Sequence, residues 1–191
     1  MLSKEEIISI FQETGAMLTG HFKLTSGRHS DRYFQCALVL QHPVHTEKLC
    51  RELASKFTGE NIAAVAGPAT GGIIVAYETA RALGVRGIFT ERENGVMSLR
   101  RGFKIKSGEK VLVVEDVITT GGSVREVIDL VRSLGGEVVG AGVLVDRSGG
   151  TADLGVRKEA LLTIEAVSYD PEDCPLCREG LPAVKPGSRD I

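Results

Sequence analysis

An apolar run followed directly by two acids is the feature that most constrains the fold of this chain. Residues 111–114 are unbroken apolar positions, three of them valine, which is typical of a strand covered on both faces, as in a parallel sheet. Glu115 and Asp116 come next. Because burying two adjacent acids without partners costs free energy, we expect both to lie at the carboxyl end of the strand, facing a crevice and close to water.

The loop behind these acids, residues 119–123, combines hydroxyl groups with paired glycines. Glycine lets several backbone N–H groups point into one concavity, and a helix predicted over 123–134 would direct the positive end of its dipole to the same place. The stretch therefore predicts a phosphate site; the alternative is an ordinary turn with capping residues. No lysine follows the glycines, residues 67–74 lack a GK[ST] ending, and no dinucleotide fingerprint occurs, so nucleotide triphosphatase and dinucleotide loops are disfavoured.

Strand and helix patterns alternate along the chain. Helices are predicted over 3–14 with a Ser3/Glu6 capping box, 45–57, 72–83 closed by Gly84, and 123–134. Strands are predicted over 62–66, 85–90, 111–114, 138–145 and 161–167. This order predicts an α/β fold, a Rossmann-like, mostly parallel sheet flanked by helices, with a ligand crevice at the carboxyl ends of the strands.

Length and charge limit the class of protein. A chain of 191 residues predicts a single domain, with a small N-terminal flap (1–40) and an extended C-terminal tail (174–191). A net charge of −2 gives no basic field for nucleic acid. No segment approaches the ~20 apolar residues of a membrane helix, and the first residues lack the apolar core of a signal peptide. We therefore expect a soluble cytoplasmic protein.

Two further loops are expected at the crevice. Residues 67–72 follow a predicted strand and carry Thr70 and paired glycines, although alone they could be a simple turn into a helix. Residues 91–102 are polar, contain Gly95 and carry Arg92, Arg100 and Arg101. This composition predicts a mobile hairpin that closes over an anionic substrate, the alternative being solvated surface arginines.

Residues 113–123 resemble the phosphoribosyl pyrophosphate (PRPP) signature of the type I phosphoribosyltransferases. Residues 24–34 are similar to the N-terminal base-recognition segment of the orotate phosphoribosyltransferase family, and the resemblance continues in the family's order through 67–73 and 145–147. It covers most of the chain. The resemblance implies the type I phosphoribosyltransferase fold and a pentosyltransferase of de novo pyrimidine (UMP) biosynthesis. Such an enzyme transfers ribose 5-phosphate from PRPP to orotate with Mg²⁺, giving orotidine 5′-monophosphate and pyrophosphate, as a homodimer.

The resemblance also implies roles for individual residues. The candidate catalytic residues are Glu115, Asp116 and Arg92. The candidate PRPP-binding residues are Thr70, Gly71, Arg92, Arg100, Arg101, Glu115, Asp116, Val117, Ile118, Thr119, Thr120, Gly121, Gly122 and Ser123. The candidate orotate-binding residues are Thr25, Ser26, Gly27, Thr119 and Arg147. Arg28 and His29 lie in the same base-recognition segment without an assigned role, and His29 is equally compatible with a surface or capping position.

The chain departs from the family's usual pattern in the loop at 91–102. There the family carries several lysines and a histidine, partly donated across a dimer interface, whereas here only Arg92 matches and Glu93 stands where lysine is common. Thr25 and Gly71 also occupy positions where many family members have lysine. Arg100 and Arg101 are therefore proposed, on charge alone, to take the place of the missing cations. Two alternative functions follow: a PRPP-binding regulator, although no helix-turn-helix accompanies the domain, or a transferase acting on another nucleobase.

Cys174 and Cys177 have the spacing of half a structural zinc site. The residues considered to complete it are Cys36, Cys50, His42 and His45. Because one such pair alone is weak evidence, free thiols in a reducing cytoplasm are the favoured interpretation, and no resident metal ion is predicted.

Overall fold

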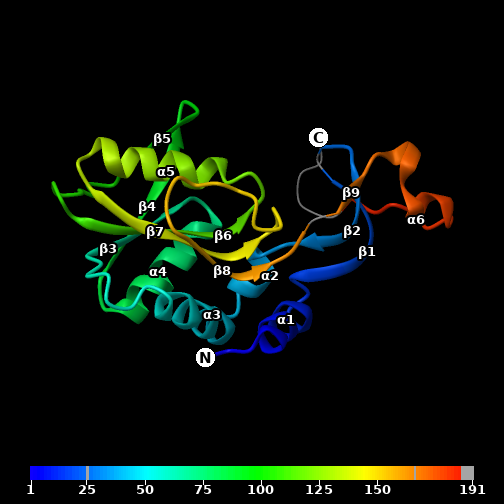
Figure 1. Ribbon diagram of the computed structural model, residues 1–191, viewed down its shortest axis with the longest axis horizontal. Coiled ribbons are helices and arrows are strands. Elements are labelled where there is room, and N and C mark those ends of the chain that lie inside the picture. The colour runs from blue at the N-terminus through cyan, green and yellow to red at the C-terminus, as the bar shows by residue number, and fades with distance from the viewer. Residues whose placement is uncertain (25, 166, 186–191) are drawn as a thin grey trace.

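A six-stranded sheet forms the centre of the computed structural model, which describes residues 1–24, 26–165 and 167–185 (Figure 1). Its strand order is β5-β4-β3-β6-β7-β8. The strands β3 (Ala64–Pro68), β4 (Arg86–Glu93), β6 (Lys110–Ile118), β7 (Glu137–Asp146) and β8 (Lys158–Thr163) pair in parallel, and β5 (Val96–Ser98) pairs antiparallel with β4. The predicted mostly parallel α/β fold is confirmed.

Helices cover both faces of this sheet (Figure 1). The helix α5 (Gly122–Ser133) lies on one face; α3 (Pro43–Ser55), α4 (Gly71–Leu83), α1 (Lys4–Glu13) and the short α2 (Ala37–Leu40) lie toward the other. In β6, Leu112 and Val114 join the core under α3 and α4, while Val111 and Val113 join the core under α5. Alternate side chains are thus buried on opposite faces, which explains why residues 111–114 are apolar without interruption.

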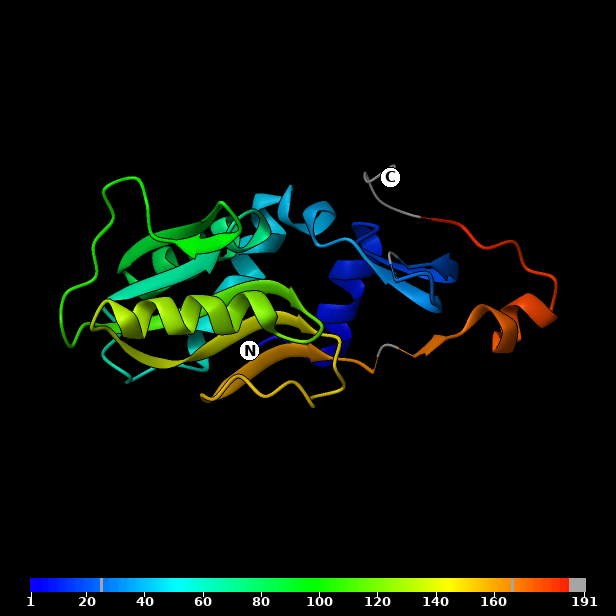
Figure 2. The same cartoon turned by 90° about the horizontal axis from the view of Figure 1, so that it is seen from above.

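A second, three-stranded antiparallel sheet stands to one side of the body (Figures 1 and 2). It consists of β1 (Met17–Lys23), β2 (His29–Phe34) and β9 (Ser168–Tyr169), and the chain continues from β9 into a 3-10 turn (Pro171–Asp173) and α6 (Pro175–Arg178). Residues 17–34 and 167–185 together are called the side lobe below. Val184 of the tail returns to form a parallel bridge with Phe22 of β1.

Several element boundaries follow the predicted signals. The capping box is present, because Glu6 N–H donates to Ser3 Oγ at 3.2 Å and Ser3 N–H donates to Glu6 Oε2 at 2.7 Å. Gly84 ends α4 in the left-handed conformation, at φ 70°. Among the described residues, no helix is long and apolar enough to cross a membrane.

Two predicted strands differ most from the observed limits. β6 continues four residues beyond the predicted end at Val114, because its pairing with β7 runs on to Ile118 and Asp146. The last strand of the sheet was predicted over 161–167, but β8 spans Lys158–Thr163. The first residues of β8 are polar, and they belong to the strand because they pair with β7. An apolar pattern in the local sequence does not indicate such long-range pairing.

Candidate active site

Two cavities meet at the loop that follows β6. The smaller, of about 250 Å³, is bounded by the end of β6, the start of α5, Arg92 and Glu126. The larger, of about 1140 Å³, lies between the body and the side lobe, with residues of β1, β2, α2, α4 and β9 on its walls. Thr119 and Thr120 line both cavities. One loop can therefore contact a phosphate on one side and a larger group on the other.

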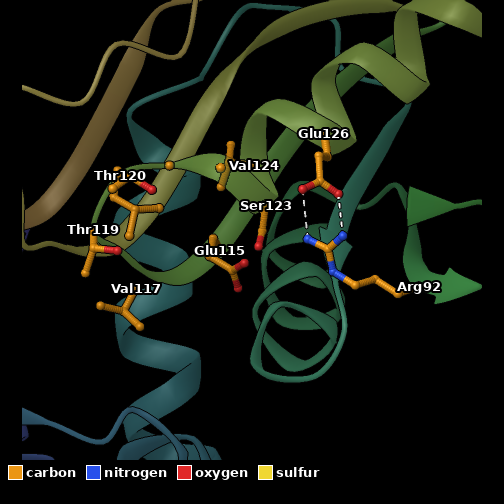
Figure 3. A pocket seen from close by; sticks show the side chains of 11 residues that line it. Arg92, Glu115, Val117, Thr119, Thr120, Ser123, Val124 and Glu126 are labelled. Atoms are coloured by element: carbon orange, nitrogen blue, oxygen red, sulfur yellow. Dashed lines mark hydrogen bonds and ion pairs between the residues drawn. The ribbon is translucent and has the colours of Figure 1, made fainter. Parts of the chain in front are cut away.

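The loop at the start of α5 has the geometry of an anion cradle. Gly121 adopts φ 76°, and an added Cβ would collide with the Leu154 side chain, so only glycine fits. No side chain caps α5, which leaves its first backbone N–H groups available to a ligand. The predicted loop residues Val117, Ile118, Thr119, Thr120, Gly121, Gly122 and Ser123 all line the smaller cavity (Figure 3).

The two acids lie inside β6 and not beyond its end. Glu115 is only 9% exposed, so the expectation that both acids stay close to water is wrong for Glu115. Burial, and then the neighbouring Asp116, raises the pKa of Glu115 to about 9. The carboxyl groups accept hydrogen bonds from the backbone of the strand: Asp116 N–H donates to Glu115 Oε1 at 3.1 Å and Val117 N–H to Asp116 Oδ1 at 2.9 Å.

The start of α4 approaches these acids closely. An added Cβ on Gly71 would overlap the Asp116 carboxylate, and one on Gly72 would lie 2.9 Å from Glu115 Oε1. Any side chain at positions 71 and 72 would therefore collide with the two acids, which explains why both positions are glycine. Thr70 and Gly71 line the larger cavity, beside Asp116.

The hairpin formed by β4 and β5 delivers only one of the predicted arginines to the site. Arg92 lies on the wall of the smaller cavity, where its Nη1 is 2.7 Å from Glu126 Oε2 and its Nη2 donates to Glu126 Oε1 at 2.8 Å (Figure 3). Glu126 raises the pKa of Arg92. Arg100 and Arg101 line neither cavity; they pair with Glu93 at 3.5 Å and with Glu91 at 2.8 Å.

Arg147 lines the larger cavity, and its guanidinium group has no partner within the part of the chain that the structure describes. Its backbone N–H donates to Ile118 O at 2.9 Å, which fixes it beside the loop. Burial lowers the pKa of Arg147. Among the described residues, no group accepts a hydrogen bond from its buried Nε, and none forms an ion pair with it. An unmatched buried cation of this kind is suited to a planar anion that can accept two hydrogen bonds.

The predicted base-recognition segment is the turn between β1 and β2. Ser26 lines the larger cavity, and Gly27, at φ 83°, closes the turn with its N–H on Leu24 O at 2.9 Å. Thr25 lies outside the described residues. Arg28 faces β9 instead of the cavity, since it donates to Ser168 Oγ at 2.9 Å and to Asp170 Oδ1 at 2.7 Å.

The larger cavity also contains residues that the sequence did not single out. Lys23, Tyr33, Ser168 and Lys185 all line it. Lys23 directly precedes the segment 24–34, which carries the family resemblance, and Tyr33 lies inside it. The resemblance could therefore have indicated these two residues. Ser168 and Lys185 carry no local signal, because they reach the cavity only through the folding of the C-terminal segment onto β1 and β2.

Comparison with known proteins gives consistent results. The chain matches the family described as "Phosphoribosyl transferase domain" over residues 40–167. It is 73% identical over 190 residues to a protein of Pelotomaculum thermopropionicum named orotate phosphoribosyltransferase, covering 100% of both chains. It is 70% identical over 190 residues to one of the same name from Desulforamulus reducens, again covering 100% of both. A crystal structure of orotate phosphoribosyltransferase from Aeropyrum pernix has 31% identity and a TM-score of 0.69, covering 83% of this chain and 94% of that one.

Proposed function

The chain belongs to the phosphoribosyltransferase family, in its orotate phosphoribosyltransferase branch, and from this premise we propose how its two cavities serve the reaction. The enzyme transfers the ribose 5-phosphate group of PRPP to orotate, giving orotidine 5′-monophosphate and pyrophosphate, in pyrimidine biosynthesis. The observation that carries the proposal is the unmatched Arg147 guanidinium, which lies in the larger cavity beside a loop that also lines a phosphate-sized one.

The smaller cavity holds the 5′-phosphate. Thr119, Thr120 and Ser123 supply hydroxyl groups, and the uncapped start of α5 supplies backbone donors and the positive end of its dipole. Arg92 adds a cation on the wall of this cavity when its pair with Glu126 opens. Asp116 and Glu115, between the two cavities, accept hydrogen bonds from the ribose hydroxyls.

The larger cavity holds orotate. Arg147 pairs with the orotate carboxylate or with a ring carbonyl, and the turn at Ser26 and Gly27 covers the base from the side lobe. Thr70 and Gly71, on the body side, approach the pyrophosphate. Displacement with inversion requires the base and the departing pyrophosphate to lie on opposite sides of the anomeric carbon.

Catalysis here depends on placement and electrostatics. A ring nitrogen of orotate displaces pyrophosphate, so positive charge develops on the ribose and negative charge on the leaving group. Asp116, near the carboxyl end of β6, stabilises the first of these charges. No nucleophilic serine, cysteine or histidine is needed.

The site suits Mg²⁺ bound through the substrate. Glu115 and Asp116 offer the oxygen ligands that this ion prefers. Burial and the neighbouring Asp116 raise the pKa of Glu115, and a nearby cation would favour its ionised form. When bound, Mg²⁺ neutralises the charge of the pyrophosphate. We include a homodimer in the proposal: Tyr77 on α4 is 65% exposed, which suits burial against a second copy. The cytoplasmic location stays a prediction.

Steady-state assays with PRPP, Mg²⁺ and either orotate, uracil, hypoxanthine or adenine test the proposed function. Turnover with orotate alone, abolished by EDTA and restored by Mg²⁺, is the expected result. Turnover with another base would assign a different transferase. Saturable PRPP binding with no turnover on any base would assign a regulator.

A further inference from the structure

Four metal-ligating side chains converge inside the side lobe, away from the two cavities. They are His21 of β1, His29 of β2, and Cys174 and Cys177 of the C-terminal segment, and one donor atom from each lies within 4.8 Å of the others. His21, His29 and Cys174 are 5%, 7% and 0% exposed, while Cys177 lies at the surface. The residues considered from the sequence to complete the cysteine pair, Cys36, Cys50, His42 and His45, do not belong to this cluster.

The distances within the cluster are those of atoms around one small ion. A tetrahedral zinc ion, with bonds of about 2.0–2.1 Å to nitrogen and about 2.3 Å to sulfur, holds its donor atoms roughly 3.3–3.8 Å apart. His21 Nε2 lies 3.5 Å from Cys174 Sγ and 3.8 Å from Cys177 Sγ, and His29 Nδ1 lies 3.3 Å from Cys177 Sγ. The two nitrogens are 2.8 Å apart and would separate by about 0.5 Å to reach that geometry.

A neighbouring carbonyl group orients His21 as a ligand. Its Nδ1 lies 2.7 Å from Leu181 O, an atom that can only accept a hydrogen bond. The proton of a neutral His21 is therefore on Nδ1, and the lone pair of Nε2 is directed into the cluster. Metal-ligating histidines are commonly held by such a bond from their second nitrogen.

Hydrogen bonding between the two imidazoles is the competing explanation of the short nitrogen contact. It accounts for His21 and His29 but not for both sulfur atoms converging on the same nitrogens. The packing of the lobe also favours a cross-link: among the described residues 167–185, Cys174 is the only buried one, and Leu181 and Val184 are 46% and 57% exposed. A segment with so little apolar burial needs another source of stability.

We propose that His21 Nε2, His29 Nδ1, Cys174 Sγ and Cys177 Sγ bind one structural zinc ion that fastens the C-terminal segment to the hairpin of β1 and β2. Two thiolates and two imidazoles in a closed tetrahedral set are the donors that select zinc. The exposed Cys177 gives the ion a path of entry.

The ion acts on the active site by position only. His21 and His29 flank the turn that carries Ser26, and the C-terminal segment carries Ser168 and Lys185, so the zinc joins two walls of the larger cavity. Resting on the proposed function, this predicts that loss of zinc weakens orotate binding several-fold and leaves PRPP binding, which uses the body, nearly unchanged.

Metal analysis of the full-length, untagged protein, purified under reducing conditions, tests the proposal independently of the activity. About one zinc per chain is expected. Chelator-treated, reduced protein should bind one Co²⁺ with the intense visible absorption of a tetrahedral thiolate site. Cys177→Ser and His29→Gln should weaken metal binding at least about 100-fold.

Two matched variants serve as controls. Cys50→Ala removes a buried thiol of the body core and His42→Gln removes an imidazole of the loop before α3, and both should keep one metal ion per chain. PRPP binding by every variant checks that the body is folded. Absence of stoichiometric Zn²⁺ and Co²⁺ binding by the reduced wild-type protein, or equal metal content in the ligand and control variants, would overturn the proposal.

Discussion

The body and the side lobe are stabilised in different ways. The body buries apolar side chains on both faces of a six-stranded sheet, and every residue from Val111 to Val114 is 0% exposed. The side lobe contributes few buried apolar residues, chiefly Phe22 and Phe34, and its interior holds the imidazoles of His21 and His29. The loop at 119–123 therefore stands on a scaffold built by apolar burial, whereas the turn between β1 and β2 is flanked by the buried polar side chains of His21 and His29.

Replacement of Lys158 tests the body and should have the largest effect. Its Nζ lies 2.7 Å from Oδ2 of the fully buried Asp146. Burial by itself would raise the pKa of Asp146, but hydrogen bonds from Lys158 and Ser148 lower the pKa overall. Lys158→Met leaves that carboxylate without its cation and should reduce the free energy of unfolding by about 3 kcal/mol or more.

Urea denaturation measures this loss. Lys110→Met is the control, because Lys110 lies 3.9 Å from Glu137 in a partly exposed pair, and should cost less than about 1 kcal/mol. Zinc content should be unchanged in both variants. Equal stability of the two variants would show that the buried pair contributes no more to the stability of the body than the exposed pair does.

Asp116→Asn tests the chemistry that the body performs. The change is nearly isosteric but removes the negative charge that we propose faces the ribose, so kcat should fall about 100-fold or more while the melting temperature changes little. Asp129→Asn, on the exposed side of α5, is the matched control and should retain wild-type kcat. Unchanged kcat in Asp116→Asn would exclude this residue from the site.

Arg147→Ala separates the two cavities. The guanidinium has unmatched donors in the larger cavity, so its loss should raise the KM for orotate about 10- to 100-fold, the equivalent of one or two charge-assisted hydrogen bonds. The KM for PRPP should change much less. Arg125→Ala, an exposed arginine of α5 that donates to Asp153 O, is the control. A larger effect on PRPP than on orotate would refute the assignment of this cavity to the base.

Glu115→Gln tests the smallest effect at each step, the change of stability per pH unit. Because the pKa of Glu115 is raised in the folded protein to about 9, the folded state holds a proton that the unfolded state releases above its ordinary value of 4.5. Wild-type stability should therefore fall as the pH rises toward 9, by at most about 1.4 kcal/mol per pH unit from this group.

Thermal unfolding at several pH values between 6 and 9 measures this slope. Glu115→Gln should flatten it, whereas Glu172→Gln, at an exposed position of the side lobe, should not. The same slope in wild type and Glu115→Gln would show that this carboxyl is not protonated in the folded protein.

The sequence predicted the body well because its signals are local. The apolar run 111–114, the Ser3 capping box and the Gly84 helix end each report structure within a few residues. Three features could not be predicted from such local signals. They are the burial of Glu115, the polar start of β8 and the side lobe. The burial of Glu115 depends on the continued pairing of β6 with β7, and the start of β8 depends on its pairing with β7. The side lobe joins residues that are far apart in the sequence: His21 contacts Cys174, which lies 153 positions further along the chain. No local pattern encodes that contact.

The most direct test of the whole account is a crystal structure with orotidine 5′-monophosphate, a ligand that carries both the phosphate and the base. We expect the phosphate on the backbone amides of residues 119–123 and the orotate carboxylate or a ring carbonyl on Arg147, between the body and the side lobe. A phosphate bound away from that loop, or a base that leaves Arg147 without a partner, would contradict it.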